Sequence, residues 1–573
     1  MKKIELMVFG LLCLILISSC TENFDELNTD QNGFLTEEVS AKFFLTDTQF
    51  RLYSPDRFPY WRAHLIHSDR YAGHFTFGHN SSWWPDELAY SYSAGFTDAS
   101  FGWLSGYLGN VLDFSRQVEE GAELENEFMF AMALIIKGLY YQMYTDTFGM
   151  VPFTEAGVDG ILTPKYDEQS VIYQGIIADL NKAMDIIGST ERTGVGVDDV
   201  GENDIYLGGD LQKWKKLANT LKLRIGMRAL GAPGENFASQ TISEALSAPL
   251  LDRISGSDLD LWGGNVVMKK DFVISQWAAA AYGDVWHNFG GGSDWTIGAT
   301  LINLLQDYND PRLSAYAKPA KGGEFRFIDA TDPDDGSRID PNFQVRLDFI
   351  LETLDTAGAT YTTSTVADTT FLEVPAGQFI GQPTRINGDT YPYVRYDLFS
   401  TPSDRVIQPK GSQVDAYPEI VLTSAESYFL QAEAAVRGLS GGDAQALFTD
   451  GIREAMKLWS IPDGDAETYI ATETIADIST GTVDEKLEKI ALQRWLVSYT
   501  DGFEAWTVVR DTGYPSDLAA GVSDPIIFGL GTLDGDYPQR LRYGSGAQDN
   551  PNFSAVEPIQ GEDRQGTTLW FAQ

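Results

Sequence analysis

The sequence predicts a mainly α-helical protein in which a tetratricopeptide-like helical scaffold carries large loop-rich insertions. Segments of helical periodicity and helix-scale length recur along the 573-residue chain. Long stretches rich in glycine, aspartate, proline, threonine and aromatic residues separate them and show little of that period. No linker or low-complexity run divides the sequence, so we expect one domain, although a 34-residue repeat signature is not legible.

Two strong helical segments lie in the N-terminal half. Residues 128–149, "FMFAMALIIKGLYYQMYTDTFG", are apolar on nearly every side, which is typical of a helix buried among others. Residues 211–230, "LQKWKKLANTLKLRIGMRAL", alternate basic and apolar faces. Gly231 follows directly and is a natural helix C-cap. Both segments are predicted to be helices of the scaffold.

Three more helices are predicted near the C-terminal end. They span residues 424–438, 443–460 and 484–503. A short loop of glycine and serine joins the first two, and alanines stand where two helices would approach closely. We therefore expect these two helices to form an antiparallel hairpin.

The stretches 54–110, 255–300 and 321–418 are predicted to be loops with short strands. Their composition favours turns, and they carry little helical periodicity. Loops on a rigid scaffold are where binding residues concentrate, so the functional site is expected in these stretches.

The N-terminus, "MKKIELMVFGLLCLILISSC", has the pattern of a secretory signal. Two lysines precede an apolar run at residues 6–17, which is too short for a comfortable membrane span. The small residues that lead to Cys20 resemble a bacterial lipobox, which is cleaved before its cysteine and lipidated there. We expect a lipoprotein signal peptide at residues 1–19, a lipid on Cys20, and a single domain at residues 20–573. A soluble secreted protein is the alternative.

Charge narrows the class of partner. The chain has 82 acidic and 41 basic residues, a formal net charge of −41. Such an excess of carboxylates repels phosphate backbones, so no nucleic acid is expected as a partner, and a neutral or cationic ligand fits better.

Five marker segments occur in a fixed order along the chain. They are "AMALIIKGLYYQMYTDTFGMVPF" (131–153), "DLQKWKKLANTLKLRIGMRA" (210–229), "YNDPRL" (308–313), "AESYFLQAEAAVRG" (425–438) and "KIALQRWLVSYTDGFEAWTVVRDTGYP" (489–515). Together they resemble the SusD/RagB family of outer-membrane lipoproteins. Gln493 stands where the family often has glutamate, and Glu504-Ala505-Trp506 departs from its Arg-Trp-Asp pattern, so the chain resembles a divergent branch.

The resemblance implies a SusD-like fold and a surface-exposed lipoprotein of the cell outer membrane, anchored by its lipid. Such a protein captures oligosaccharides as a lid on a SusC-like TonB-dependent transporter. It implies neither catalysis nor a cofactor. It transfers no sugar-binding residue, because the family's site lies in variable loops.

A sugar site needs flat aromatic platforms, since pyranose rings have apolar faces and polar edges. Covering one sugar face removes ~100 Å² of apolar surface from water, worth ~2.5 kcal/mol. A millimolar dissociation constant already requires about 4 kcal/mol, so a cluster of two or three aromatic side chains is expected.

Two tryptophan-rich loops meet this description, at residues 73–87 and 282–295. The predicted ligand-binding residues are Trp83, Trp84, Trp286, Trp295, His79, Asn80, Asp86 and Asn288. Trp83 and Trp84 would point to opposite sides of an extended segment, so one of them is expected to be buried. The alternative for any loop tryptophan is that it fills a hydrophobic hole under a long loop. Tyr391 and Tyr393 could extend a platform or simply pack a loop.

By contrast, Trp214, Trp459 and Trp495 lie in helical segments and are predicted to be core. Four histidines fall within sixteen residues, but no zinc signature completes them, so no metal site is expected. The acidic loop at residues 329–342 could hold a structural calcium ion, although a solvated loop is the preferred interpretation.

The leading hypothesis is a non-catalytic glycan-binding lipoprotein, with a neutral glucan such as a β-glucan as the favoured ligand. One alternative is a glycoside hydrolase or other secreted carbohydrate-active enzyme, whose paired carboxylates no single sequence reveals. Another is an adhesin or peptide-capture lid that acts through its partner surface.

Overall fold

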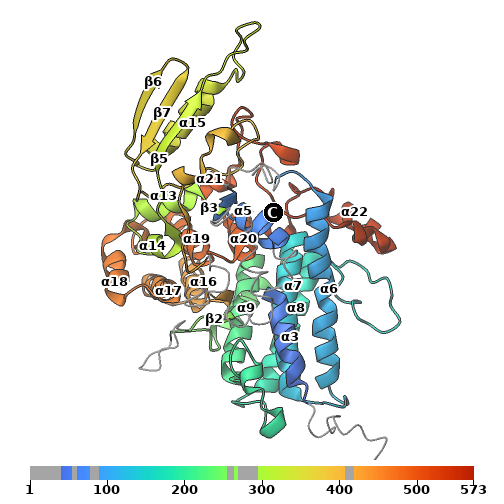
Figure 1. Ribbon diagram of the computed structural model, residues 1–573. Coiled ribbons are helices and arrows are strands. Elements are labelled where there is room, and N and C mark those ends of the chain that lie inside the picture. Colours follow the sequence, from blue (N-terminus) through green and yellow to red (C-terminus); the bar gives the residue numbers. More distant parts are fainter. Residues whose placement is uncertain (1–39, 54–60, 78–89, 254–263, 269–294, 407–417) are drawn as a thin grey trace, which may run out of the picture.

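The computed structural model describes residues 40–53, 61–77, 90–253, 264–268, 295–406 and 418–573 (Figure 1). Most of the regular structure is helical. The longer helices are α3 (Lys42–Tyr53), α6 (Ala94–Val118), α7 (Glu127–Phe148), α8 (Gln169–Ile187), α9 (Leu211–Ala229), α10 (Ala238–Leu246), α13 (Ala299–Asp307), α15 (Phe343–Thr356), α16 (Ser424–Val436), α17 (Ala444–Leu458), α18 (Asp463–Thr472), α19 (Val483–Val497) and α20 (Gly502–Thr512). Short α-helical turns are α5 (Asp69–Tyr71), α14 (Leu313–Tyr316), α21 (Ser516–Ala519) and α22 (Val556–Gln560), and Trp61–Ser68 form a π-helix.

Successive helices pack side by side, as in a tetratricopeptide-like scaffold. Helix α7 packs against α8, α8 against α9 and α9 against α10, and α16 packs against both α17 and α19 (Figure 1). The predicted fold class is therefore confirmed, as are the predicted helices that became α7, α9, α16 and α17. None of the described helices is both long enough and apolar enough to cross a membrane.

Helix α7 lies at the centre of the scaffold, with buried side chains on nearly every side. The Asn126 side chain caps it by accepting hydrogen bonds from the backbone N–H groups of Phe128 and Met129, at 3.1 and 3.0 Å. A Cβ at Gly138 would lie 3.2 Å from Ile176 of α8, so a glycine permits the close approach of the two helices.

Helix α6 contradicts the loop prediction for residues 54–110. Four glycines lower the helix propensity of this segment. Its buried side chains nevertheless recur at intervals of three and four residues, and this amphipathic face packs on α3 and α7. The positions that carry this period are Thr97, Ser100, Leu104, Tyr107, Val111, Phe114 and Val118. Tertiary burial has overridden weak propensity.

The helix predicted at residues 484–503 is confirmed as α19, but it ends at Val497, and a second helix, α20, begins at Gly502. The chain turns between α19 and α20, where Thr500 has a positive φ of 78°. The Asp501 side chain then accepts a hydrogen bond from the backbone N–H of Glu504 at 3.3 Å and starts α20 as its N-cap. In the same way α9 ends at Ala229, and Gly231, at φ 95°, forms the turn after it.

The stretch 321–418 contains the predicted short strands, but also helix α15, which the prediction missed. The strands of the protein are β1 (Phe75–Phe77), β2 (Val266–Met268), β3 (Trp295–Ile297), β4 (Ala317–Lys318), β5 (Gly323–Ile328), β6 (Thr362–Val366), β7 (Thr369–Val374), β8 (Thr401–Pro402) and β9 (Glu419–Leu422). Antiparallel pairs form between β1 and β3, β2 and β9, and β4 and β8, and a three-stranded sheet has the order β5-β7-β6.

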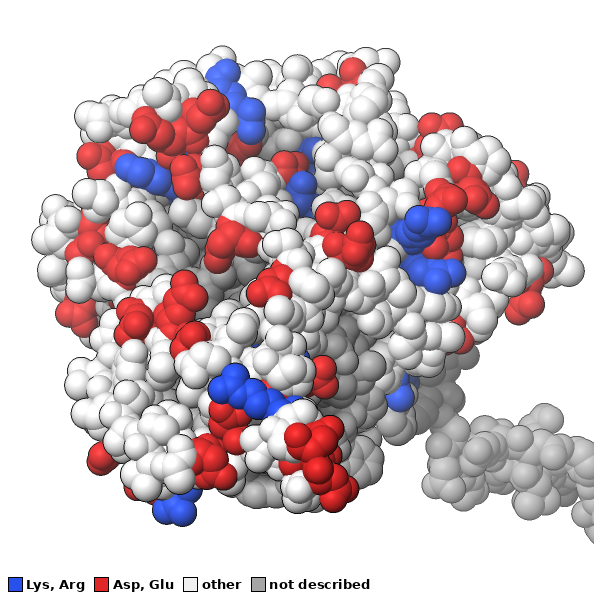
Figure 2. All heavy atoms as spheres, turned by 90° about the horizontal axis from the view of Figure 1, so that it is seen from above, with Lys and Arg blue, Asp and Glu red and all other residues white. Residues whose placement is uncertain are grey.

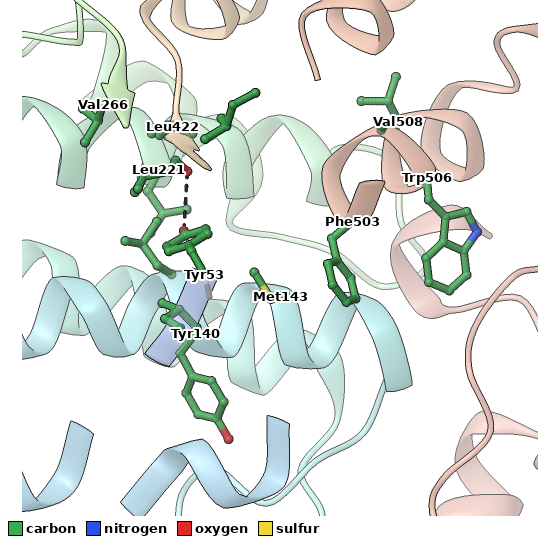
Figure 3. Close-up of a cluster of buried hydrophobic side chains, with 14 of the residues drawn as sticks. Tyr53, Tyr140, Met143, Leu221, Val266, Leu422, Phe503, Trp506 and Val508 are labelled. Carbon is green, nitrogen blue, oxygen red and sulfur yellow. Dashed lines mark hydrogen bonds between the residues drawn. The ribbon is translucent and has the colours of Figure 1, made fainter. Parts of the chain in front are cut away.

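The main core lies where the helices and small strands meet. Figure 3 shows Tyr53, Met143 and Phe503 converging from α3, α7 and α20. Trp214, Trp459 and Trp495 are at most 1% exposed, which confirms them as core. A second hydrophobic cluster lies between the β5-β7-β6 sheet, α15 and residues 380–399.

A buried ion-pair network joins the helices of the main core. The carboxylate of Glu504 on α20 pairs with three arginines: Arg224 at 3.6 Å and Arg228, both on α9, and Arg494 of α19 at 3.7 Å. All four side chains are at most 4% exposed. Burial alone would raise the pKa of Glu504, but the three guanidinium charges lower that pKa to about 2.

Each arginine also has a second carboxylate partner from another element. These further partners are Glu426 of α16 for Arg224, Asp146 of α7 for Arg228 and Glu433 of α16 for Arg494. The network therefore ties α7, α9, α16, α19 and α20 together through charge-assisted hydrogen bonds.

Glu504→Gln is expected to lower the free energy of unfolding by about 3–5 kcal/mol, because three buried guanidinium groups lose a shared countercharge. Glu467→Gln, at an exposed pair with Arg453, should cost about 1 kcal/mol or less and is the matched control. Chemical denaturation at neutral pH measures both.

The same network predicts a pH dependence. The pKa of Glu504 is about 2 in the folded state against an ordinary value of 4.5, so its stabilisation is complete above about pH 4.5 and is lost as the pH falls towards 2. The difference between wild type and Glu504→Gln should narrow over that interval. Equal destabilisation by Glu504→Gln and Glu467→Gln at neutral pH would contradict the role of the network.

Candidate functional site

Strands β1 and β3 form a short antiparallel ribbon that joins the ends of the two tryptophan-rich segments. Phe77, the last residue of β1, pairs with Trp295, the first residue of β3. In the sequence, residues 78–89 follow Phe77 directly and residues 269–294 directly precede Trp295. Two segments about two hundred residues apart therefore begin and end at one place in the fold.

The side chain of Gln382 fastens this ribbon from outside it. This fully buried amide donates from Nε2 to the carbonyl oxygen of Phe77 at 3.0 Å and accepts from the Thr296 hydroxyl at 2.9 Å. The backbone N–H of Gln382 also donates to the carbonyl oxygen of Ile297 at 2.8 Å. One residue thus holds both strands.

Trp295 is 2% exposed, so its indole faces protein rather than an open surface. Its ring packs edge-on against Phe77, with centroids 5.6 Å apart, and the guanidinium carbon of Arg70 lies 5.3 Å from the indole centroid. This is the packing role that was the alternative for a loop tryptophan. In this structure Trp295 supports the ribbon and offers no open platform.

The other predicted ligand-binding residues lie outside the described residues, so their prediction stands as it was made. They are Trp83, Trp84, Trp286, His79, Asn80, Asp86 and Asn288. The same is true of Cys20 and the signal peptide at residues 1–19, and the single domain at residues 20–573 stays a prediction.

The described histidines near the ribbon are packing residues. Burial lowers the pKa of both His67 and His74 to about 3, so both rings are neutral at physiological pH. His74 packs against Trp495 with centroids 4.7 Å apart, and His64 packs edge-on against Phe503 at 5.0 Å. Across the described ranges, no group of three or more His, Cys, Asp or Glu side chains is arranged to hold a metal ion.

The acidic loop at residues 329–342 uses its carboxylates locally. Asp332 accepts a hydrogen bond from the backbone N–H of Asp334, and Asp329 pairs with Arg338 at 2.8 Å. Figure 2 shows Asp and Glu spread across the visible face, with Lys and Arg in a few small groups.

A cleft that the sequence did not predict opens beside the β5-β7-β6 sheet. It is a cleft of about 530 Å³ between the end of β5, the start of α15 and residues 388–395. Tyr393, for which the sequence allowed either a platform or a loop-packing role, contributes to its wall and is itself 7% exposed. Only folding brings these three segments together, so no local sequence pattern marks the cleft.

Comparison with known proteins identifies the fold's relatives. The SusD-like family model described as "Starch-binding associating with outer membrane" matches residues 34–329 and 350–543. No curated protein matches the chain.

Solved structures share the fold at low sequence identity. A chitin-binding protein has 22% identity and a TM-score of 0.68, with 93% of this chain and 100% of that one covered. A SusD-like protein from Bacteroides thetaiotaomicron has 22% identity and a TM-score of 0.67, with 93% and 98% covered. A SusD homologue from Bacteroides ovatus has 17% identity and a TM-score of 0.67, with 93% and 99% covered.

Gln382→Ala should cost about 1–3 kcal/mol of unfolding free energy, because the buried Phe77 carbonyl loses its amide donor and the Thr296 hydroxyl keeps only its longer bond to the Thr76 carbonyl. It should also speed hydrogen exchange of the β1 and β3 amides. Gln344→Ala, which removes an exposed amide on α15, is the control and should change neither. Unchanged exchange in Gln382→Ala would show that the ribbon holds without this contact.

Proposed function

The chain belongs to the SusD-like family, and from this membership we propose that it is a non-catalytic, surface-exposed lipoprotein that captures oligosaccharides at the outer membrane. In this proposal it needs no cofactor. It delivers the glycan to a SusC-like TonB-dependent transporter, and a lipid on Cys20 anchors it to the membrane.

The observation that carries the proposal is the β1–β3 ribbon. It joins the sequence segments that contain Trp83, Trp84 and Trp286 at one pair of residues, Phe77 and Trp295. Binding a sugar chain requires more than one aromatic platform. Platforms on two segments act on one ligand more readily when the segments start side by side in the fold. We propose that Asn80, Asp86 and Asn288, with His79, bind the sugar hydroxyls beside these indoles.

The proposed ligand is a neutral glucan, with a β-glucan favoured. The excess of carboxylates disfavours polyanionic glycans, since repeated negative charges on a polymer would meet a surface of the same sign. A protein of similar fold is named for binding chitin, also an uncharged polysaccharide, which supports the neutral class.

Replacing the loop tryptophans tests the site. Trp286→Ala is expected to weaken oligosaccharide binding about tenfold or more, because an indole face is worth ~2.5 kcal/mol against a sugar. Of Trp83→Ala and Trp84→Ala, one should weaken binding similarly and the other should lower stability. Phe43→Ala, at an exposed ring of α3, is the control.

Isothermal titration against neutral oligosaccharides and polyuronates measures these affinities. Binding to polyuronates alone would refute the proposed ligand class. New reducing ends after incubation with the bound glycan would instead establish a glycoside hydrolase. Unchanged uptake in cells that carry the tryptophan variants would favour an adhesin or peptide-capture lid.

The anchor gives a separate prediction. Cys20→Ala should abolish incorporation of labelled palmitate and move the protein from the membrane fraction to the soluble fraction, because no thiol remains at the cleavage site. Cys13→Ala should leave labelling intact, since that residue lies in the removed peptide. Labelling of the Cys20→Ala variant would disprove the lipid attachment.

A further inference from the structure

Part of the wall of the cleft beside the β5-β7-β6 sheet comes from sequence that the family model does not match. The match stops at residue 329 and resumes at residue 350. Six lining residues fall in this unmatched stretch: Ile339, Asp340, Pro341, Asn342, Phe343 and Arg346. The cleft thus combines this unmatched stretch with residues of the matched segments, among them Phe327, Tyr393 and Arg395.

Aromatic side chains make the floor of the cleft. The rings of Phe327 and Tyr393 are stacked, with centroids 5.8 Å apart and planes at 7°, and Phe343 packs against Tyr393 at 5.8 Å. At the mouth, Ile328 and Ile339 are 58% and 68% exposed. Because the three rings are at most 7% exposed, they support the cleft from below, and the apolar surface open to a ligand is that of the two isoleucines.

Polar side chains that are hydrogen-bonded to one another fix the shape of the cleft. The buried Arg346 pairs with Asp340, and its Nε donates to the Thr390 hydroxyl at 3.1 Å. The Tyr393 hydroxyl donates to the same Asp340 carboxylate at 2.7 Å. Because these groups satisfy one another, they hold the walls in place.

Two other polar groups that line the cleft lack such partners. Arg395 lies with its guanidinium carbon 5.6 Å from the centroid of Phe327, and it pairs with no carboxylate of the described chain. Its one hydrogen bond within the described residues, to the carbonyl oxygen of Arg326, is long at 3.4 Å. The Asn342 amide makes no side-chain hydrogen bond to any described residue.

The charge of the lining differs from that of the molecule. Three arginines and two aspartates line the cleft, whereas the whole chain carries a net charge of −41. A planar guanidinium without a countercharge is suited to a carboxylate, which it can bind through two parallel hydrogen bonds. The exposed apolar side chains of Ile328 and Ile339 at the same mouth suit the C–H face of a cyclic ligand.

We propose that this cleft binds a single uronic acid unit, at an end or a branch of the captured glycan. Arg395 binds the sugar carboxylate, the Asn342 amide binds a ring hydroxyl, and the exposed side chains of Ile328 and Ile339 cover the C–H face of the ring. This proposal rests on the proposed glycan-binding function and adds to it. One carboxylate on an otherwise neutral chain avoids the repulsion that a polyuronate would meet.

Titration of the full mature chain with methyl glucuronide and methyl glucoside tests the cleft. The glucuronide should bind at least about tenfold more tightly, since the two sugars differ chiefly in the carboxylate, and charged hydrogen bonds are worth about 1.5–3 kcal/mol. Arg395→Gln should remove this preference. Arg338→Gln, in the same unmatched stretch but outside the lining, is the matched control and should preserve it.

A second variant and a second probe keep the test independent of folding. Asn342→Ala should weaken the glucuronide severalfold without changing its preference over glucoside. Benzoate should bind more weakly than the glucuronide, because it has no hydroxyl for Asn342. Equal affinity for glucuronide and glucoside, an unchanged preference in Arg395→Gln, or tighter binding of benzoate would each overturn the proposal.

Neutral oligosaccharides separate this inference from the function on which it rests. If Arg395→Gln and the wild type bind them equally while neither prefers glucuronide, the cleft proposal fails and glycan capture stands. If the wild type binds no neutral or acidic oligosaccharide, the proposed function itself fails.

Discussion

The scaffold depends on one buried carboxylate. Glu504 sits among Arg224, Arg228 and Arg494, and its charge allows three guanidinium groups to remain inside the core. Many helix arrangements would bury the same apolar surface, but few would also pair all the buried charges of this network. We infer that the network fixes the relative positions of the helices, and that the small strands and loops are built on that fixed frame.

The same network explains why the fold could be predicted from sequence. The markers that suggested the family contain its members: Asp146, Arg224, Glu426 and Glu504 each lie in a different one. Recognising those segments amounts to recognising a shared buried core. Helical periodicity predicted α7, α9, α16 and α17 independently, because each buries a continuous face that local spacing reveals.

The features that the sequence could not predict depend on contacts between residues that are distant in the sequence. The sequence predicts a loop where helix α6 forms, because its glycines weaken the local helical signal, although its buried residues have helical spacing. Trp295 and a ligand platform look the same in sequence, and only the position of Arg70 and Phe77 shows that its ring is enclosed. The cleft at Arg395 has no local signature, since three separate segments form it.

The ribbon and the cleft are connected through one stretch of chain. Gln382 holds β1 and β3, and Arg395 lies thirteen residues later in the same stretch. Ser400, at the end of the stretch, is hydrogen-bonded to its start and to β3. Its backbone N–H donates to the carbonyl oxygen of Ile380 at 2.7 Å, and its carbonyl oxygen accepts from the N–H of Ile297 at 2.9 Å. Thirteen extended residues reach roughly 45 Å at most, so Arg395 lies within that distance of the residue that holds the ribbon. If the loop tryptophans held a glycan long enough to reach Arg395, its end or branch would already be confined near the cleft. Binding at each site would then raise the effective concentration of the glycan at the other.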